Sequence, residues 1–206
     1  MSFPLRRPTR ASFLLVAVLF TVLPGCSALR QDDPKILEVY SLDQKPLCRV
    51  AILPFQNETS NDQGSLIVYR VFVAEMNSLT KIMVVPEGDI RHIYRQLHIY
   101  PSHSLDSEKI RILADRLGAD ALITGKVTEM REEKQGDSVN PIIGINIQML
   151  DAATGKIINS TYHKRDGDHY RMLMHFGKIS TVTELSKYMA REIIQALEEK
   201  GIHSCR

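Results

Sequence analysis

The chain has 206 residues, of which 44% are hydrophobic and 24% are charged; this composition excludes disorder over most of its length and suits one globular domain plus a targeting segment. Its three cysteines are too few for a disulfide-rich scaffold. The formal net charge of +2 includes Arg6, Arg7 and Arg10. Without these three residues the chain has 23 basic and 24 acidic residues, and its net charge is −1. The charge therefore gives no evidence for nucleic-acid binding.

Residues 1–25 have the parts of a secretory signal peptide. The three arginines give it a positive start, and the apolar run at 11–23 is shorter than the roughly 20 residues that a membrane span needs. The sequence Leu-Pro-Gly-Cys at 23–26 resembles the bacterial lipobox, whose cysteine receives a diacylglycerol and a further acyl chain such as palmitate. We therefore predict cleavage before Cys26 and lipidation of that residue. An ordinary signal peptide, or a membrane anchor with a cysteine nearby, is the alternative.

The segment 26–47 is polar and irregular, and we expect it to be a lipidated tether. Fully extended, the 23 residues from Cys26 to Arg49 reach at most about 80 Å, so the domain should stay near its membrane. Ser27 follows the cysteine, and a residue other than aspartate at this position favours sorting to the outer membrane. The expected location is the periplasmic face of the outer membrane, with the membrane contacted through the lipid anchor.

Residues 48–206 show the alternating periodicities of an α/β domain. The predicted elements, in chain order, are strand 49–55, helix 66–79, strand 81–85, helix 86–99, helix 104–117, strand 120–127, strand 141–150, strand 156–164 and helix 181–201. Thr181 and Glu184 resemble a capping box at the start of the last helix. The order β-α-β-α-α-β-β-β-α predicts a single α/β domain with a mixed β-sheet flanked by helices.

Three short segments carry a resemblance to a known superfamily. They are Val50–Asn57 (VAILPFQN), Leu117–Gly125 (LGADALITG) and Leu150–Ile157 (LDAATGKI). Their order and spacing resemble those of the lipoproteins that include CsgG, LpoB and the amino-terminal domain of TolB, and FlgO is similar in the same places. The resemblance implies a TolB-N/CsgG-like fold for residues 48–206 and an outer-membrane lipoprotein. Two features differ, because LpoB-type activators have a longer tether and CsgG-like channels have additional membrane-spanning hairpins.

The helix expected over 66–79 is apolar around most of its circumference, so more than one of its sides must be covered. Two explanations stay open. The last helix and the tether cover it, or it forms a surface for self-association or for a partner. In the second case Val68, Phe72 and Met76 are the candidate partner-surface residues.

Two cysteines remain after lipidation, Cys48 before the first strand and Cys205 after the last helix. Export places both in an oxidising compartment, and the two ends of a domain often lie close together. We therefore predict a Cys48–Cys205 disulfide, with two free thiols as the alternative.

No residues stand at the spacing of a catalytic or metal site, and we predict no catalytic residue, metal or cofactor. Two groups with histidines lack fixed ligand spacing; they are His92, His98 and His103, and His163, Asp166, Asp168, His169 and His175. Glu129–Lys134 (EMREEK) is expected to be a solvated strand end and loop.

The leading hypothesis is a non-enzymatic envelope lipoprotein that binds envelope proteins in outer-membrane or surface-appendage assembly. The alternatives are a CsgG-like oligomeric secretion-channel subunit and a hydrolase or ligand-binding enzyme. Homo-oligomerisation is left open.

Overall fold

The computed structural model describes residues 35–38, 47–100, 105–136, 138–172 and 176–200. Its elements are β1 (Ile36–Glu38), β2 (Arg49–Ile52), β3 (Gln56–Asn57), α2 (Gly64–Leu79), β4 (Met83–Val84), α3 (Glu87–Gln96), α4 (Ser107–Leu117), β5 (Ala121–Gln135), β6 (Ser138–Asp151), β7 (Ile157–Asp166), the 3-10 helix η1 (Gly167–Tyr170) and α5 (Val182–Glu199). All of these elements belong to one compact unit. None of the helices among the described residues has the length and apolar character needed to cross a membrane.

Seven strands form one mixed sheet in the order β1-β7-β6-β5-β2-β4, with β3 paired to β5 beyond the end of β2. The pairs β1–β7, β7–β6 and β6–β5 are antiparallel. The pairs β5–β2, β2–β4 and β3–β5 are parallel. The predicted fold class, a single α/β domain with a mixed sheet flanked by helices, is confirmed.

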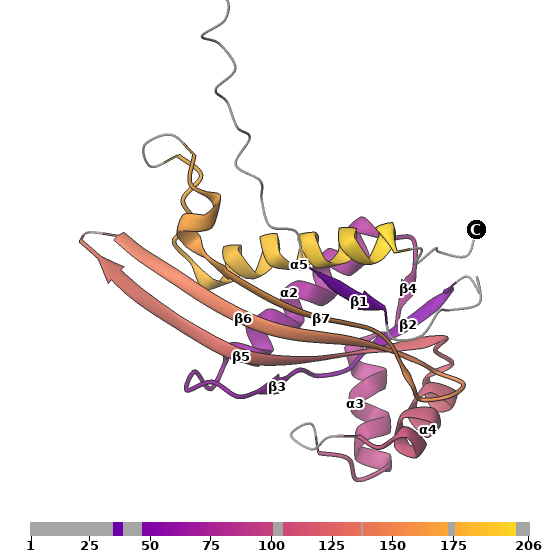
Figure 1. Cartoon of the computed structure of the whole chain (residues 1–206). Helices are drawn as coiled ribbons and strands as arrows, with labels where there is room; N and C mark the ends of the chain where they lie inside the picture. The colour runs from indigo at the N-terminus through magenta and orange to yellow at the C-terminus, as the bar shows by residue number, and fades with distance from the viewer. Residues whose placement is uncertain (1–34, 39–46, 101–104, 137, 173–175, 201–206) are drawn as a thin grey trace, which may run out of the picture. The chain divides into compact units, whose positions relative to one another are not determined.

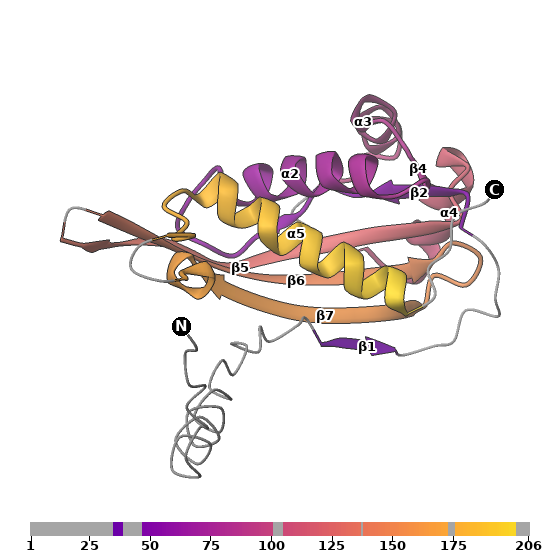
Figure 2. The same cartoon turned by 90° about the horizontal axis from the view of Figure 1, so that it is seen from above.

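Helices cover both faces of this sheet, which separates two apolar clusters. The helices α2 and α5 lie side by side across one face (Figure 2), and α3 and α4 pack near β2 and β4 on the other (Figure 1). Alternate residues of the strands point to opposite faces. Ile123 of β5 therefore joins the α2–α5 cluster, and Leu122 joins the α3–α4 cluster.

The close approach of α2 to the sheet depends on a glycine in β5. A Cβ at Gly125 would lie 2.6 Å from the ring of Phe55, so only glycine leaves room for this ring. The Phe55 ring in turn packs against Tyr69 and Phe72 of α2, with ring centroids 5.6 and 5.7 Å apart. Such aromatic contacts stabilise the packing beyond the apolar area that they bury.

Two helix ends form as their sequence signals predict. The hydroxyl of Thr181 accepts a hydrogen bond from the Glu184 backbone N–H at 3.3 Å, which caps the start of α5. Gly118 ends α4 in the left-handed conformation with a φ of 59°, where glycine is favoured. At the start of α4, Asp106 is the cap and accepts from the Lys109 backbone N–H at 2.8 Å.

Three segments differ from the predicted elements. The tether expected over 26–47 includes β1, which pairs with β7; three residues are too few to show a strand pattern. Glu129–Lys134 is not a loop, because β6 pairs with β5 as far as Gln135 and so supplies a backbone partner along the charged stretch. The strand predicted to end at Lys164 continues to Asp166.

The predicted partner surface on α2 is wrong. The relative exposures of Val68, Phe72 and Met76 are 2%, 0% and 2%, and all three lie in the cluster between the sheet and α5. The all-round apolar character of α2 is explained by cover from the sheet on one side and α5 on another. These three side chains therefore stabilise the core.

The start of β2 is fixed by Asp120, whose Oδ2 accepts hydrogen bonds from the backbone N–H groups of Cys48 at 2.9 Å and Arg49 at 3.0 Å. Cys48 is disulfide-bonded. The predicted partner, Cys205, and the predicted lipidation site, Cys26, lie outside the described residues, so the pairing and the lipidation stay predictions.

Candidate partner-binding groove

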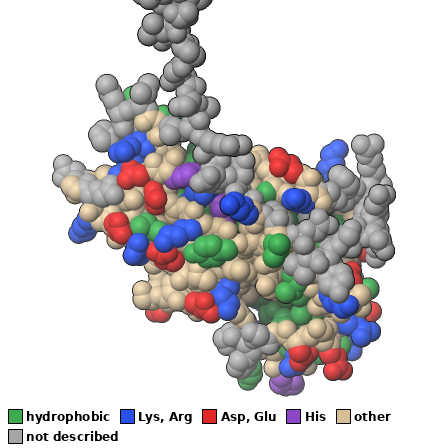
Figure 3. Space-filling view, viewed as in Figure 1, with side chains coloured by type: hydrophobic (Ala, Val, Ile, Leu, Met, Phe, Trp, Pro, Cys, Tyr) green, Lys and Arg blue, Asp and Glu red, His purple; other side chains and the backbone are tan. Residues whose placement is uncertain are grey.

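A groove of about 330 Å³ lies where the strands meet α3 and α4. Figure 3 shows this part of the molecule hollowed, with hydrophobic side chains around the hollow. Its lining residues come from the β2–β3 connection, from the helical side and from the two long strands; they are Leu53, Pro54, Gln56, Tyr94, Leu105, Ile110, Thr124, Gly125, Lys126, Thr128, Asn146, Gln148 and Leu150.

The groove exists because α3 and α4 cover only part of their face of the sheet. Their apolar cluster includes Leu122 and Leu150, a paired position on β5 and β6. The next pairs on the same face are Thr124 with Gln148 and Lys126 with Asn146. The side chains on this face therefore change from apolar to polar where the helices end, which is the pattern of a sheet face that meets water.

The groove combines an apolar wall with neutral polar groups. Burial, and secondly the nearby Tyr69, raises the pKa of Tyr94, so its phenol stays protonated and is a hydrogen-bond donor. The strand side offers hydroxyl and amide groups from Thr124, Asn146 and Gln148. Such groups donate and accept hydrogen bonds, as the backbone of a bound chain segment requires.

A cation stands at the rim of the groove. Lys126 Nζ lies 2.8 Å from Glu58 Oε1, and both side chains are exposed. Because exposed ion pairs contribute little to stability, this lysine is available to a ligand at small cost. The groove thus offers apolar contact, neutral hydrogen-bonding groups and one exchangeable charge.

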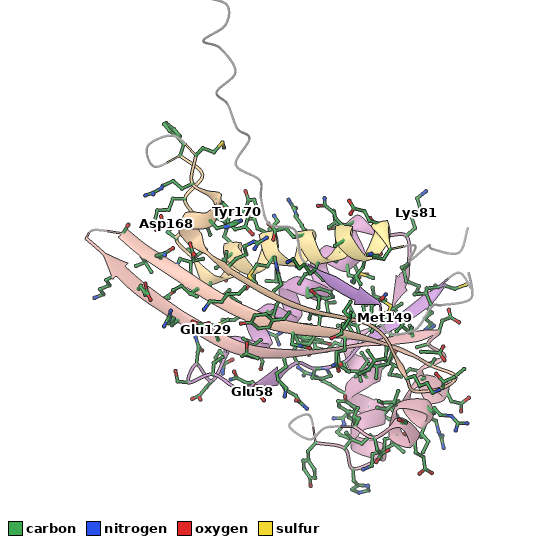
Figure 4. All side chains as sticks on the ribbon, in the orientation of Figure 1. Glu58, Lys81, Glu129, Met149, Asp168 and Tyr170 are labelled. Atoms are coloured by element: carbon green, nitrogen blue, oxygen red, sulfur yellow. The ribbon has the colours of Figure 1, made fainter. Side chains whose placement is uncertain are left out.

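A second polar cluster lies on the opposite face, where it joins β7 and η1 to α5. Glu192 Oε2 lies 2.5 Å from His163 Nε2 and accepts from Arg165 Nε at 3.2 Å, while Glu192 Oε1 accepts from the Tyr170 hydroxyl at 2.8 Å. Figure 4 shows Tyr170 and Asp168 at η1, beside the first turns of α5. All three partners of Glu192 come from one stretch of chain, so its carboxylate fastens η1 to the helix.

The ionisation of Glu192 fits a structural role. Burial raises the pKa of its carboxyl, but the hydrogen bonds from His163 and Tyr170 and the charge of Arg165 outweigh burial and hold the pKa below its ordinary value of 4.5. Burial, and then the Arg165 charge, lowers the pKa of the neighbouring His169. Near neutral pH the carboxylate is therefore charged, and both of its oxygens are in hydrogen-bond contact with neighbouring side chains. This arrangement suits a structural link between η1 and α5 rather than a catalytic base.

The structure separates the two groups of histidines considered from the sequence. His163 is buried against Glu192, whereas Asp166 caps η1 by accepting from the His169 backbone N–H at 3.0 Å. His92 is exposed on α3, beside Gln96. His103 and His175 lie outside the described residues. Within the described ranges, no group of three or more His, Cys, Asp and Glu side chains is placed to hold a metal ion.

The groove was not predicted from the sequence. Asn146 and Gln148 stand out as polar positions of a hairpin, but their place beside Tyr94 and Ile110 depends on contacts between distant segments. A signal was present in the alternation on β5 and β6, where one face changes from Leu to Thr and Lys and from Leu to Gln and Asn.

Comparisons with known proteins support the fold. No protein-family model matches the chain, and no curated protein matches it significantly in sequence. A PelC dodecamer from Paraburkholderia phytofirmans is similar in structure, with a TM-score of 0.54 and 14% identity, over 80% of this chain and 97% of that one. Lipoprotein GNA1162 from Neisseria meningitidis has a TM-score of 0.53 and 15% identity, over 74% of this chain and 99% of that one.

The LpoB C-terminal domain from Salmonella enterica also matches, with a TM-score of 0.42 and 16% identity, over 60% of this chain and 86% of that one. At these identities the first two likenesses concern the fold, and the third adds no argument. The chain shares the overall fold of the PelC and GNA1162 chains.

Proposed function

We propose that this chain is a non-enzymatic lipoprotein of the bacterial envelope whose domain binds a protein partner in the groove beside β5 and β6. In this proposal residues 1–25 are removed, Cys26 carries the acyl chains, and residues 26–35 link it to the sheet on the periplasmic face of the outer membrane. The signal-peptide pattern and the lipobox support the anchoring. The shared fold with a protein described as a lipoprotein is in keeping with it.

The observation that carries the proposal is that the groove continues onto a part of the sheet face that none of the described helices covers. Past Thr128 of the groove lining, the same face of the strands presents Gly144 and Tyr162, and Tyr162 is 55% exposed. A small molecule is normally enclosed by its site, whereas a ligand here would lie partly on open strands. An extended or flat segment of a partner protein matches a groove of this form.

A charge placed in the groove tests this proposal. Gln148→Arg should weaken the co-purification of envelope partners with the acylated protein by about tenfold or more, since a buried unpaired cation opposes binding. Gln96→Arg makes the same chemical change on the exposed surface of α3 and should leave co-purification unchanged. Thermal unfolding of both variants shows whether each is folded. Folded Gln148→Arg protein that retains its partners would contradict the assignment of the groove.

Self-assembly is a second candidate, because the PelC of similar fold is described as a dodecamer. The oligomeric secretion-channel alternative predicts a large ring when the acylated protein is extracted in mild detergent. The partner-binding proposal predicts a small particle. Analytical ultracentrifugation of the extracted protein distinguishes the two.

A further inference from the structure

Two large apolar side chains are strongly exposed beside η1. Met172 is 73% exposed and Phe176 is 74% exposed, more than any other large hydrophobic side chain of the described residues. Tyr188, on an early turn of α5, is 41% exposed, and its ring centroid lies 5.0 Å from that of Tyr170. The structure does not describe residues 173–175. We call Met172 and Phe176 the apolar tip.

The base of the apolar tip is held firmly on the domain. The backbone N–H of Met172 donates to the Phe176 carbonyl at 2.7 Å and so holds the two tip residues together. Gly177 follows with a φ of 81°, and a Cβ there would lie 2.5 Å from the Tyr170 carbonyl oxygen. Tyr170 itself is bound to Glu192. The two apolar side chains therefore project from a fixed support.

The apolar tip lies at the end of the sheet from which the chain leads back to Cys26. In the antiparallel β1–β7 pair, Ile36 faces Thr161 and Glu38 faces Asn159. The chain before Ile36 therefore leaves β1 in the direction in which β7 runs towards η1, and both views show the first end of β1 turned to that side (Figures 1 and 2).

Distances make a shared membrane contact feasible. From Cys26 to Lys35 there are nine residues, which reach at most about 32 Å when extended. On β7, the five residues from Thr161 to Asp166 span about 17 Å, and η1 follows directly. An acyl group on Cys26 thus keeps this end of the sheet within reach of the bilayer.

We propose that Met172 and Phe176 enter the interfacial layer of the membrane in which Cys26 is anchored and give the domain a second membrane contact. This inference rests on the lipid anchoring in the proposed function. Aromatic and apolar side chains are favoured at the interfacial layer. Arg171, which precedes Met172, and Lys187, near the start of α5, are both exposed. Their positive charges suit phospholipid phosphates. The acyl chains on Cys26 hold the chain at one point only, so a second contact would also orient the groove.

The chain contains no tryptophan, which allows a direct test. Phe176→Trp places a single fluorophore in the tip, and Met83→Trp places one at the opposite edge strand, β4, at a position that is 60% exposed. The acylated full-length variants are reconstituted into vesicles of phosphatidylethanolamine and phosphatidylglycerol that contain brominated acyl chains. The emission of Phe176→Trp should shift to the blue and lose most of its intensity, while that of Met83→Trp should stay unchanged.

Flotation of the same vesicles distinguishes a failure of the lipid anchoring from a failure of the second membrane contact. Protein that does not float contradicts the lipid anchoring itself. Floating protein in which Phe176→Trp is quenched no more than Met83→Trp overturns the second contact and leaves the anchoring intact. An emission shift that appears only after envelope proteins are added, without bromine quenching, would mean that the tip binds protein and would also overturn the proposal.

Discussion

Glu192 joins three side chains of β7 and η1 to α5 through its two carboxylate oxygens. We predict that Glu192→Gln lowers the free energy of unfolding by about 3–5 kcal/mol, because the buried Arg165 would lose this counter-charge. Urea unfolding followed by circular dichroism measures the change. Glu198→Gln alters an exposed carboxylate of the same helix and should have almost no effect. Equal losses in the two variants would contradict the role assigned to Glu192.

The same residue gives a pH dependence of defined sign. Because its pKa in the folded protein lies below 4.5, the contribution of Glu192 is fully present above that pH and is lost as the pH falls through the lowered value. The wild type should therefore lose more stability than Glu192→Gln when the pH is taken below about 4.5. Equal losses of stability in the two proteins as the pH falls would show that the Glu192 carboxylate contributes nothing to stability.

Gly125 and Gly88 give a matched pair of substitutions with opposite expected signs. Gly125→Ala places a methyl group against Phe55 and should lower the unfolding free energy by about 1–3 kcal/mol through overpacking. Gly88→Ala, in α3, meets no atom within 4 Å and should raise it by about 0.4–1 kcal/mol. The added change Phe55→Leu should recover part of the loss in Gly125→Ala. An unchanged unfolding free energy in Gly125→Ala would mean that the Phe55 ring moves aside without cost.

At the scale of the element, α2 is the clearest correction to the sequence analysis. Phe72→Ala should lower the free energy of unfolding by about 3–5 kcal/mol, because it opens a cavity between the sheet and α5. Arg70→Ala, on the exposed side of α2, is the control. Per folded molecule, partner binding should not change in Phe72→Ala. Loss of partners at full stability would restore the α2 surface hypothesis.

Local patterns predicted most elements, but not what each packs against. The spacing of Val68, Phe72 and Met76 identifies a helix, yet core and interface require the same apolar residues. The charged stretch 129–134 has low strand propensity and becomes a strand only because β6 lies beside it. The groove was missed for the same reason, since Tyr94 and Gln148 meet through long-range contacts.

At the scale of the whole molecule, the prediction concerns the disulfide bond of Cys48. Since Cys48 is disulfide-bonded, we predict that Cys205 is its partner, closing a loop of 157 residues. The chain-entropy argument gives an upper value of about 5 kcal/mol for the stabilisation. Non-reducing peptide mass spectrometry of the mature protein should find the Cys48–Cys205 peptide pair, and Cys205→Ser should lower stability. Alkylation of Cys205 without prior reduction would exclude the pairing.

Photo-crosslinking in living cells can test whether the lipid-anchored domain binds an envelope protein through the groove beside β5 and β6. A photoreactive amino acid is placed at position 148, in the groove, or at position 96, on the exposed surface of α3, in the full-length chain. We predict a discrete adduct with an envelope protein from position 148 and none from position 96. Identical adducts from both positions, or no adduct from the groove, would contradict it.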